Sequence, residues 1–353
     1  MDATPLDILI VGAGISGIGM AARLGERCPG KTYAILERRE AIGGTWDLFR
    51  YPGIRSDSDM FTLGFKSEPW RDERAIAPGE TIRGYLQDVA DRRGITRHIR
   101  FGQTVTAADW DSAQGLWTVT LADGSSLSGK FLYLGSGYYD YDDPHQADIP
   151  GLDDFGGRTI HPQFWPEDFD YANKRVVVIG SGATAVSLVP ALAEKAAQVT
   201  MLQRTPTWYL IRPTRDPLAN LVFRLLPARW AHRINRGKNA LLQHLFIARS
   251  RARPEAVKEF LHGALAKELG PDFSREDFTP PYDPWNQRMC LVPDGDLFKA
   301  MKAGRAEVAT GRIAHVDKTG VVLEDGRRLE ADAIVTATGL RLAGLVDMGD
   351  PAG

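Results

Sequence analysis

The chain has 353 residues, of which 43% are hydrophobic and 25% are charged, so it is long enough for two globular domains. Its formal net charge of −2 gives no reason to expect a nucleic acid as partner. The two cysteines, Cys28 and Cys290, form neither a C-x-x-C motif nor a zinc-binding spacing, so we predict no metal site and a reducing compartment. The apolar run near the N-terminus is too short for a membrane span and follows no Lys or Arg, which predicts a cytoplasmic protein without a signal peptide.

The first part of the chain predicts a strand at residues 6–11, a glycine turn, and a helix that ends near residue 26. A second strand ends at Glu37, and residues 41–65 are rich in Gly, Pro, Asp and Ser, which predicts a loop. Helical spacing follows at residues 81–94. Alternating residues from 104 to 137 then predict antiparallel strands with a turn at Asp123-Gly124.

The second part repeats the beginning. Turn residues dominate from 138 to 170, and a second strand, glycine turn and helix start near residue 175, with a partner strand at residues 198–202. This pattern predicts an α/β fold with two dinucleotide-binding (Rossmann-like) three-layer domains, the second inserted in the first. The predicted parts are a first dinucleotide-binding part (1–144), a linker (145–170), a second dinucleotide-binding domain (171–330) with a helical insertion at about 217–269, and a return to the first domain (331–353).

The first nucleotide site is predicted at Gly12-Ala13-Gly14-Ile15-Ser16-Gly17, which follows a strand and opens a helix. Gly12 would make the tight turn, Gly14 would let backbone amides approach a pyrophosphate, and Gly17 would allow close packing of helix on strand. Glu37 ends the next strand and can accept hydrogen bonds from ribose hydroxyls. The alternative is a glycine turn without a ligand.

The second nucleotide site is predicted at Gly180-Ser181-Gly182-Ala183-Thr184-Ala185. The next strand ends at Arg204 and Thr205 with no acidic residue, so a forked cation could bind a 2′-phosphate, which favours NADPH over NADH. The alternative is that Arg204 is a solvated arginine at the end of a strand.

Two such sites in one chain suggest FAD at the site with the carboxylate and NADPH at the other. The chemistry would then begin with hydride transfer to the flavin. The absence of C-x-x-C from the sequence disfavours a disulfide as the electron acceptor and leaves O2.

A family resemblance becomes specific at the motif Phe155-x-Gly157-x-x-x-His161-x-x-x-Trp165-Pro166, here called the linker motif. It resembles the linker motif of type I Baeyer–Villiger monooxygenases at every fixed position. A second motif agrees, Gly43-Gly44-x-Trp46-x-x-x-x-Tyr51-Pro52-Gly53-x-x-x-Asp57. The amino-acid sequences of several segments are similar to those of the subgroup that includes the ethionamide-activating monooxygenases.

The resemblance implies an NADPH-consuming enzyme in which O2 adds to reduced FAD to form a flavin peroxide. That peroxide would insert one oxygen atom into a ketone, giving an ester or lactone, or would oxygenate sulfur. Arg288 stands where the resemblance places the cation that stabilises the peroxide, with Asp57 as its carboxylate partner. The alternatives without a catalytic role are that Arg288 is a solvated arginine in a loop and that Asp57 caps a turn. His161 is implied to couple domain position to catalysis without touching substrate.

The residues expected to contact the cofactors are then as follows. For FAD they are Gly12, Gly14, Ile15, Ser16, Gly17, Glu37, Arg38, Gly44, Thr45, Trp46, Asp57 and Val105. For NADPH they are Gly180, Gly182, Ala183, Thr184, Arg204 and Thr205.

The family pattern continues past residue 339, whereas this sequence stops at Gly353, so we expect a truncated chain with apolar surface left unburied. The alternative functions are therefore a non-catalytic FAD/NADPH-binding remnant and an uncoupled NADPH oxidase. The Arg-rich stretch at 217–269 is more typical of a solvated helical face. A face that lies on a membrane surface is its alternative.

Overall fold

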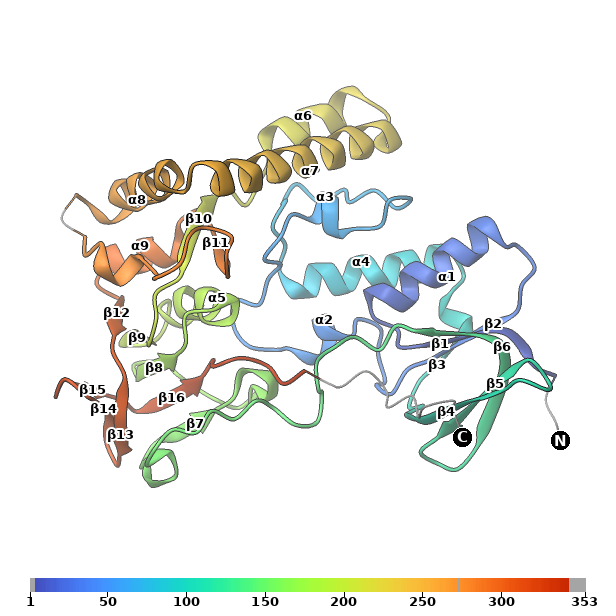
Figure 1. Ribbon diagram of the computed structural model, residues 1–353, viewed down its shortest axis with the longest axis horizontal. Helices are drawn as coiled ribbons and strands as arrows, with labels where there is room; N and C mark the ends of the chain where they lie inside the picture. Colours follow the sequence, from blue (N-terminus) through green and yellow to red (C-terminus); the bar gives the residue numbers. More distant parts are fainter. Residues whose placement is uncertain (1–3, 272, 343–353) are drawn as a thin grey trace. The chain divides into compact units, whose positions relative to one another are not determined.

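The structure is a computed structural model that describes residues 4–271 and 273–342. Within these, the chain forms two compact units, one made of residues 4–48, 79–143 and 341–342, the other of residues 49–78 and 144–340 (Figure 1). The predicted α/β class with two dinucleotide-binding units is confirmed. The last part of the predicted return segment, residues 343–353, lies outside the described residues.

The first unit is built on a six-stranded mixed sheet. Its strand order is β3 (Ile99–Arg100), β2 (Tyr33–Leu36), β1 (Leu6–Val11), β6 (Ser126–Leu134), β5 (Leu116–Leu121) and β4 (Val105–Asp111). β1 pairs in parallel with both β2 and β6, whereas β5 pairs antiparallel with β4 and β6. Its helices are α1 (Ile15–Arg27), α2 (Thr45–Leu48) and α4 (Gly79–Arg92), with a 3-10 turn at Thr96–His98.

The core of this unit explains why β1 is almost wholly apolar. Leu9 is fully buried and packs with Leu36, Val119 and Leu121. Such a run is expected of a strand covered on both faces. Close packing of α1 on β1 leaves no space at Gly17, where a Cβ atom would lie 1.8 Å from the carbonyl oxygen of Gly12.

The second unit is built on a five-stranded sheet in which every pairing is parallel. Its order is β12 (Ala306–Thr310), β9 (Gln198–Gln203), β8 (Arg175–Ile179), β16 (Ala333–Thr336) and β7 (Arg158–Ile160). Helices α5 (Ala183–Leu192) and α9 (Asp296–Lys302) belong to the same unit. An antiparallel sheet adds β13 (Ile313–Asp317), β14 (Gly320–Leu323) and β15 (Arg328–Glu330).

The linker motif supplies the edge strand β7 of this sheet. Phe155 is buried in the core with Val177, Ile179 and Ile334. A Cβ atom on Gly157 would lie 2.4 Å from the carbonyl oxygen of Asp332, so only glycine fits there. Packing therefore explains why Phe and Gly stand at positions 155 and 157 of the motif, which the sequence alone does not reveal.

The stretch at 217–269 forms three helices, α6 (Pro217–Leu225), α7 (Ala228–Ala252) and α8 (Pro254–Leu269) (Figure 1). Beside them lie a parallel strand pair and a short helix. These are β10 (Trp208–Arg212), β11 (Met289–Pro293) and α3 (Met60–Leu63). Short 3-10 turns occur at Leu152–Asp154, Pro162–Phe164 and Glu276–Phe278. None of the described helices is long and apolar enough to cross a membrane.

One local expectation needs correction. The segment at 41–65, expected to be loop, contains the helices α2 and α3. Asp59 starts α3 by accepting a hydrogen bond from the Thr62 amide at 3.0 Å, a capping signal hidden among turn residues. The pairing of β10 with β11 joins segments about 80 residues apart, which local patterning does not reveal.

The close contact at Gly17 leads to a paired prediction on helix α1. We expect Gly17→Ala to lower the free energy of unfolding by ~1–3 kcal/mol, because the new methyl group overlaps the Gly12 carbonyl. Gly25 lies in the same helix with nothing within 4 Å of an added Cβ atom, so Gly25→Ala should raise stability by ~0.5–1 kcal/mol. Urea unfolding followed by circular dichroism measures both; equal effects would contradict the packing described.

Candidate functional site

The first cavity lies where β1 gives way to α1. Gly12 has φ +95°, and a Cβ atom there would lie 2.6 Å from the Gly135 carbonyl oxygen, so the turn requires glycine. Gly14 precedes α1, and no described side chain caps this helix start. The free amides of the first turn and the helix dipole therefore offer a site for an anion.

Glu37 is the acidic group of this cavity. Its side chain is only 4% exposed. One carboxylate oxygen accepts a hydrogen bond from the Ala13 amide at 2.6 Å, and the other accepts one from the Arg39 amide at 2.9 Å. These bonds fix the carboxylate beside the glycine turn while leaving lone pairs that can accept from a ligand.

Most residues predicted to contact FAD line this cavity of about 330 Å³. They are Gly12, Gly14, Ile15, Ser16, Glu37, Arg38, Gly44, Thr45, Trp46 and Val105. Gly17 does not line it, because its role is to bring α1 close to β1. Asp57 belongs to the other unit and lines a different cavity.

The cavity wall also contains aromatic residues that sequence reasoning missed. Tyr139 and Tyr141 line it, and burial raises the pKa of the Tyr141 hydroxyl. Arg38 forms an ion pair with Asp142, and its guanidinium lies 6.0 Å from the Tyr141 ring centre. The available signal was the YYDYDD run at 138–143, in which aromatic residues alternate with acids.

The second cavity lies where β8 gives way to α5 and has a volume of about 620 Å³. Gly180 has φ +137°, and a Cβ atom there would lie 2.2 Å from the Ala337 carbonyl oxygen. Gly182 precedes α5, where again no described side chain caps the helix, and an added Cβ atom would meet nothing within 4 Å. The backbone is therefore open to close approach by a ligand at Gly182.

All six residues predicted to contact NADPH line this second cavity. They are Gly180, Gly182, Ala183, Thr184, Arg204 and Thr205. Arg288 and Arg312 line it too, so three guanidinium groups belong to one cavity, whose wall also contains the acidic residues Asp148 and Glu324. Arg312 was missed because it follows Gly311 directly after β12, where no motif marks it.

Arg288 is held in place by two hydroxyl groups. Its Nε donates to Thr207 Oγ1 at 2.8 Å, and one terminal nitrogen donates to Ser181 Oγ at 3.0 Å. Ser181 belongs to the glycine turn, so the guanidinium is anchored to the same turn that opens α5. The remaining N–H groups of this fork can bind a ligand.

Asp57 lines a third cavity, also of about 330 Å³. Its wall is largely apolar and includes Leu210, Phe246, Met289 and Leu291. Among the described residues Asp57 and Arg288 form no ion pair, so the predicted pairing is not seen in this structure. Both residues affect the buried thiol of Cys290. The pKa of this thiol is raised to about 12, mainly by burial; the Arg288 charge lowers the pKa and the Asp57 charge raises it.

Two further features mark this third cavity. Cys290 remains a neutral thiol, so it offers no thiolate for disulfide exchange. Trp285, which also lines the cavity, has φ +68°, and its buried indole N–H finds no hydrogen-bond partner among the described residues. A bulky residue in this conformation is strained, and an unpaired buried donor is costly, so both point to a functional site.

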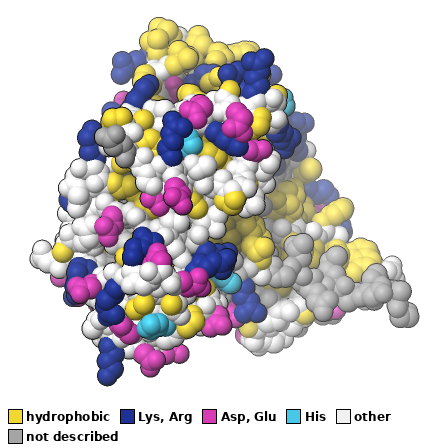
Figure 2. All heavy atoms as spheres, turned by 60° about the vertical axis from the view of Figure 1, so that its left-hand side comes forward, with side chains coloured by type: hydrophobic (Ala, Val, Ile, Leu, Met, Phe, Trp, Pro, Cys, Tyr) yellow, Lys and Arg dark blue, Asp and Glu magenta, His cyan; other side chains and the backbone are white. Residues whose placement is uncertain are grey.

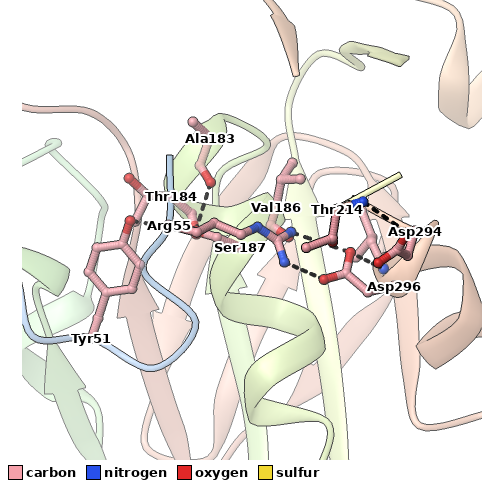
Figure 3. Close-up of polar contacts among 10 residues, drawn as sticks. Tyr51, Arg55, Ala183, Thr184, Val186, Ser187, Thr214, Asp294 and Asp296 are labelled. Atoms are coloured by element: carbon pink, nitrogen blue, oxygen red, sulfur yellow. Dashed lines mark hydrogen bonds and ion pairs between the residues drawn. The ribbon is translucent and has the colours of Figure 1, made fainter. Parts of the chain in front are cut away.

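The Tyr51-Pro52-Gly53 part of the second motif packs on α5 (Figure 3). Gly53 has φ +80°, and a Cβ atom there would lie 2.3 Å from the Ser187 carbonyl oxygen. The Ser187 hydroxyl lies 3.5 Å from the Tyr51 hydroxyl, and Arg55 donates to the Val186 carbonyl at 3.3 Å. Arg55 also forms an ion pair with Asp296, the first residue of α9. Together these contacts hold residues 51–55 against α5, whose first residues line the second cavity.

His161 of the linker motif bonds to the backbone of its own segment. Its Nδ1 accepts a hydrogen bond from the Gln163 amide at 3.2 Å. Its Nε2 is buried with no hydrogen-bond partner among the described residues. Burial lowers the pKa of His161, and the backbone of His145 and Gly339 raises it by less, so the ring is neutral at pH 7.

Comparison with known proteins identifies the family. Residues 9–221 match the family described as Pyridine nucleotide-disulphide oxidoreductase. The FAD-containing monooxygenase EthA of Mycobacterium tuberculosis is 50% identical over 342 residues, covering 96% of this chain and 70% of EthA. The chain belongs to the FAD-containing monooxygenases. In the described structure its cysteines Cys28 and Cys290 are both free.

Solved structures agree with this assignment of the monooxygenase. Cyclohexanone monooxygenase from Rhodococcus sp. Phi1 bound to NADP+ is 27% identical with a TM-score of 0.73, covering 96% of this chain and 71% of that one. Cyclohexanone monooxygenase with bound ε-caprolactone is 26% identical with a TM-score of 0.76, covering 96% and 74%. The resemblance to type I Baeyer–Villiger monooxygenases is thereby confirmed.

The Arg55–Asp296 ion pair gives a double-mutant test. We expect Arg55→Met and Asp296→Asn each to destabilise the monooxygenase, with a coupling energy of ~1 kcal/mol, because both side chains are partly buried. The exposed pair Arg158–Asp168 is the control, and its cycle should show no measurable coupling. Equal coupling in the two cycles, measured by urea unfolding, would contradict the role given to Arg55.

His161 gives a pH prediction. The unfolded chain takes up a proton on this residue below its ordinary pKa of 6.5, whereas the folded chain takes it up only at lower pH. The stabilisation is therefore present above pH 6.5 and is lost as pH falls towards the lowered folded pKa. Unfolding measured between pH 7 and pH 5 should show a smaller loss of stability for His161→Gln, and an unchanged loss for the exposed control His315→Gln.

Proposed function

We propose that the monooxygenase binds FAD in the first cavity and NADPH in the second. With them it would transfer one oxygen atom from O2 to a ketone, giving an ester or lactone, or to a sulfur atom. The observation that carries this proposal is the pair of glycine turns, each opening an uncapped helix into a cavity, with Glu37 in one and Arg204 and Arg288 in the other.

The residues of the first cavity fit FAD. The uncapped start of α1 suits a pyrophosphate, and the fixed carboxylate of Glu37 suits ribose hydroxyls. That same carboxylate would repel a 2′-phosphate, which FAD lacks. The Gly43-Gly44 segment supports the approach of a cofactor, because the Gly43 amide donates to Ala13 at 3.2 Å and keeps the backbone close to the turn.

The residues of the second cavity fit NADPH. The uncapped start of α5 suits a second pyrophosphate, and Gly182 leaves the backbone open. Arg204, exposed at the end of β9, is free to form a forked contact with a 2′-phosphate. Arg312 lines the same cavity and adds a second cation for that group.

Bound FAD, reduced by NADPH, would supply the activation of O2 and the transfer of one oxygen atom. The contribution of this chain would be a positive charge on Arg288, which Ser181 and Thr207 orient in advance and which could stabilise negative charge as it develops. Asp57 lines the third cavity together with Cys290, and it shifts the pKa of that thiol in the direction opposite to Arg288.

The third cavity supports an apolar organic substrate. Leu210, Phe246 and Met289 would hold its hydrocarbon part, and the unpaired indole N–H of Trp285 could donate to a carbonyl or sulfoxide oxygen. The cyclohexanone monooxygenase structure with ε-caprolactone supports the ketone reaction. The sulfur reaction rests on the sequence resemblance to the ethionamide-activating subgroup.

The test is to purify the protein, record its visible spectrum, and add NADPH with cyclohexanone or a thioether under air. A yellow protein that forms lactone or sulfoxide in proportion to the NADPH consumed is the expected result. A colourless protein, or a yellow one that yields only hydrogen peroxide with both substrates, would contradict the proposal.

Two arginine variants separate binding from oxygen transfer. Arg204→Ala should raise KM for NADPH by ~10–100-fold and leave KM for NADH unchanged, because it removes a charge-assisted contact. Arg288→Ala should lower product formation by at least ~100-fold while NADPH is still oxidised. The control is Arg215→Ala, since this exposed arginine pairs with Glu73 and lines none of the three cavities. Equal kinetics for all three variants would contradict the assignment.

A further inference from the structure

Helix α7 is amphipathic with its apolar side turned outward. Its buried positions carry small or polar residues: Ala231, His232, Asn235, Asn239 and Ser250. Its exposed positions include Trp230, Ile234, Leu241 and Leu245. A helix that packs on a soluble core shows the opposite arrangement.

Polar contacts fix α7 on the rest of its unit, in addition to the apolar packing of Phe246 against the cluster around Trp208. Asn239 donates to Asp59 at 2.8 Å, and Asn235 donates to the Ala219 carbonyl at 3.2 Å. One nitrogen of Arg236 donates to the carbonyl oxygens of Phe61, Thr62 and Gly64 at distances of 2.8–3.0 Å, at the C-terminal end of α3. The helix orientation is therefore fixed from the inside, and the outward position of its apolar residues follows from it.

The exposed side of α6 and α7 carries a set of large apolar residues. We call it the outer face, made up of Leu221, Leu225, Trp230, Ile234, Leu241 and Leu245, all exposed. The intervals of four, seven and four residues between Trp230, Ile234, Leu241 and Leu245 place them on one side of a helix. Leu225 is 71% exposed and Trp230 is 60% exposed. Single exposed apolar residues are common on protein surfaces, but a group of them on one side of a helix marks an interaction site.

The segment that carries this face is strongly basic. Residues 217–253 contain eight Lys and Arg residues and no Asp or Glu. Arg236 donates to the backbone carbonyls at the end of α3, and Lys238 forms an ion pair with Asp216. The others form no ion pair in the described part of the chain; they are Arg224, Arg229, Arg233, Arg249, Arg251 and Arg253. At the top of Figure 2, hydrophobic side chains gather with Lys and Arg beside them.

We propose that the outer face of α6 and α7 binds the surface of an anionic lipid bilayer. The Leu, Ile and Trp side chains would enter the boundary between headgroups and acyl chains, and the arginines beside them would contact anionic headgroups. The 25 residues of α7 form a rod ~37 Å long, which suits a flat surface. The sequence alone favoured a solvated face; the inward position of the polar residues reverses that choice.

A second copy of the chain is a poorer occupant of this face. A symmetric dimer would bring the same basic segment against itself, without one acidic residue within 217–253 to offset the repulsion. An anionic surface removes that repulsion and covers the apolar side chains as well.

The test is co-sedimentation of the protein with vesicles of phosphatidylcholine alone, or of an equal mixture of phosphatidylcholine and phosphatidylglycerol. We expect binding to the anionic vesicles only, weakening as salt is raised. Arg233→Gln with Arg251→Gln should weaken it by roughly 30-fold. Leu241→Gln with Leu245→Gln should weaken it at every salt concentration, because it removes apolar burial.

The matched control is Trp110→Gln with Phe131→Gln, two exposed aromatic residues of the first unit, which should bind vesicles like the parent. Circular dichroism melts verify that every variant is folded. Absence of binding to anionic vesicles, or binding that the arginine and leucine changes leave unaltered, would overturn the proposal. So would a dimer in light scattering that only the leucine changes dissociate, since the face would then belong to a second copy.

Discussion

The start of a helix without a side-chain cap is the feature on which the proposed chemistry depends. It occurs twice, at α1 and at α5, and each time a glycine precedes the helix and a cavity lies in front of it. The unpaired amides at such a start need a partner, and a helix dipole makes that partner an anion. The residues that follow the next strand then distinguish the two sites: a fixed carboxylate at Glu37, and an arginine at position 204.

The family motifs serve the second unit mainly as packing devices. Gly53 lets residues 51–55 lie against α5, where Tyr51 and Arg55 contact its backbone and side chains. Gly157 lets β7 lie against the chain near Asp332. Both contacts lie within the second unit, whereas Gly43, Gly44 and Trp46 of the second motif line the first cavity.

The glycine turns could be predicted from sequence because their function is local. A strand, three small residues and a helix follow one another directly along the chain, at 6–27 and again at 175–192, and Gly12 and Gly180 carry the positive φ angles that favour glycine. The antiparallel pairing of β5 and β6 could also be predicted, because the Asp123-Gly124 turn connects the two strands directly. Arg312 and the β10–β11 pairing escaped prediction because their neighbours lie far away in the sequence. The outward apolar face of α7 escaped it too, because periodicity shows that a helix has two faces but not which one is buried.

Asp57 and Arg288 show a different limit. The sequence resemblance pairs them, but the structure anchors Arg288 on Ser181 and Thr207 and leaves Asp57 in another cavity, with Cys290 under the influence of both. Pairing of two charges depends on a few ångströms, which a motif does not determine.

The most direct test of the central claim is a crystal structure of the protein grown with FAD and NADP+. We expect one pyrophosphate at the start of α1 with a ribose on Glu37, and a second at the start of α5 with the 2′-phosphate on Arg204. Density for either pyrophosphate away from its helix start, or two empty glycine turns at saturating cofactor, would contradict it.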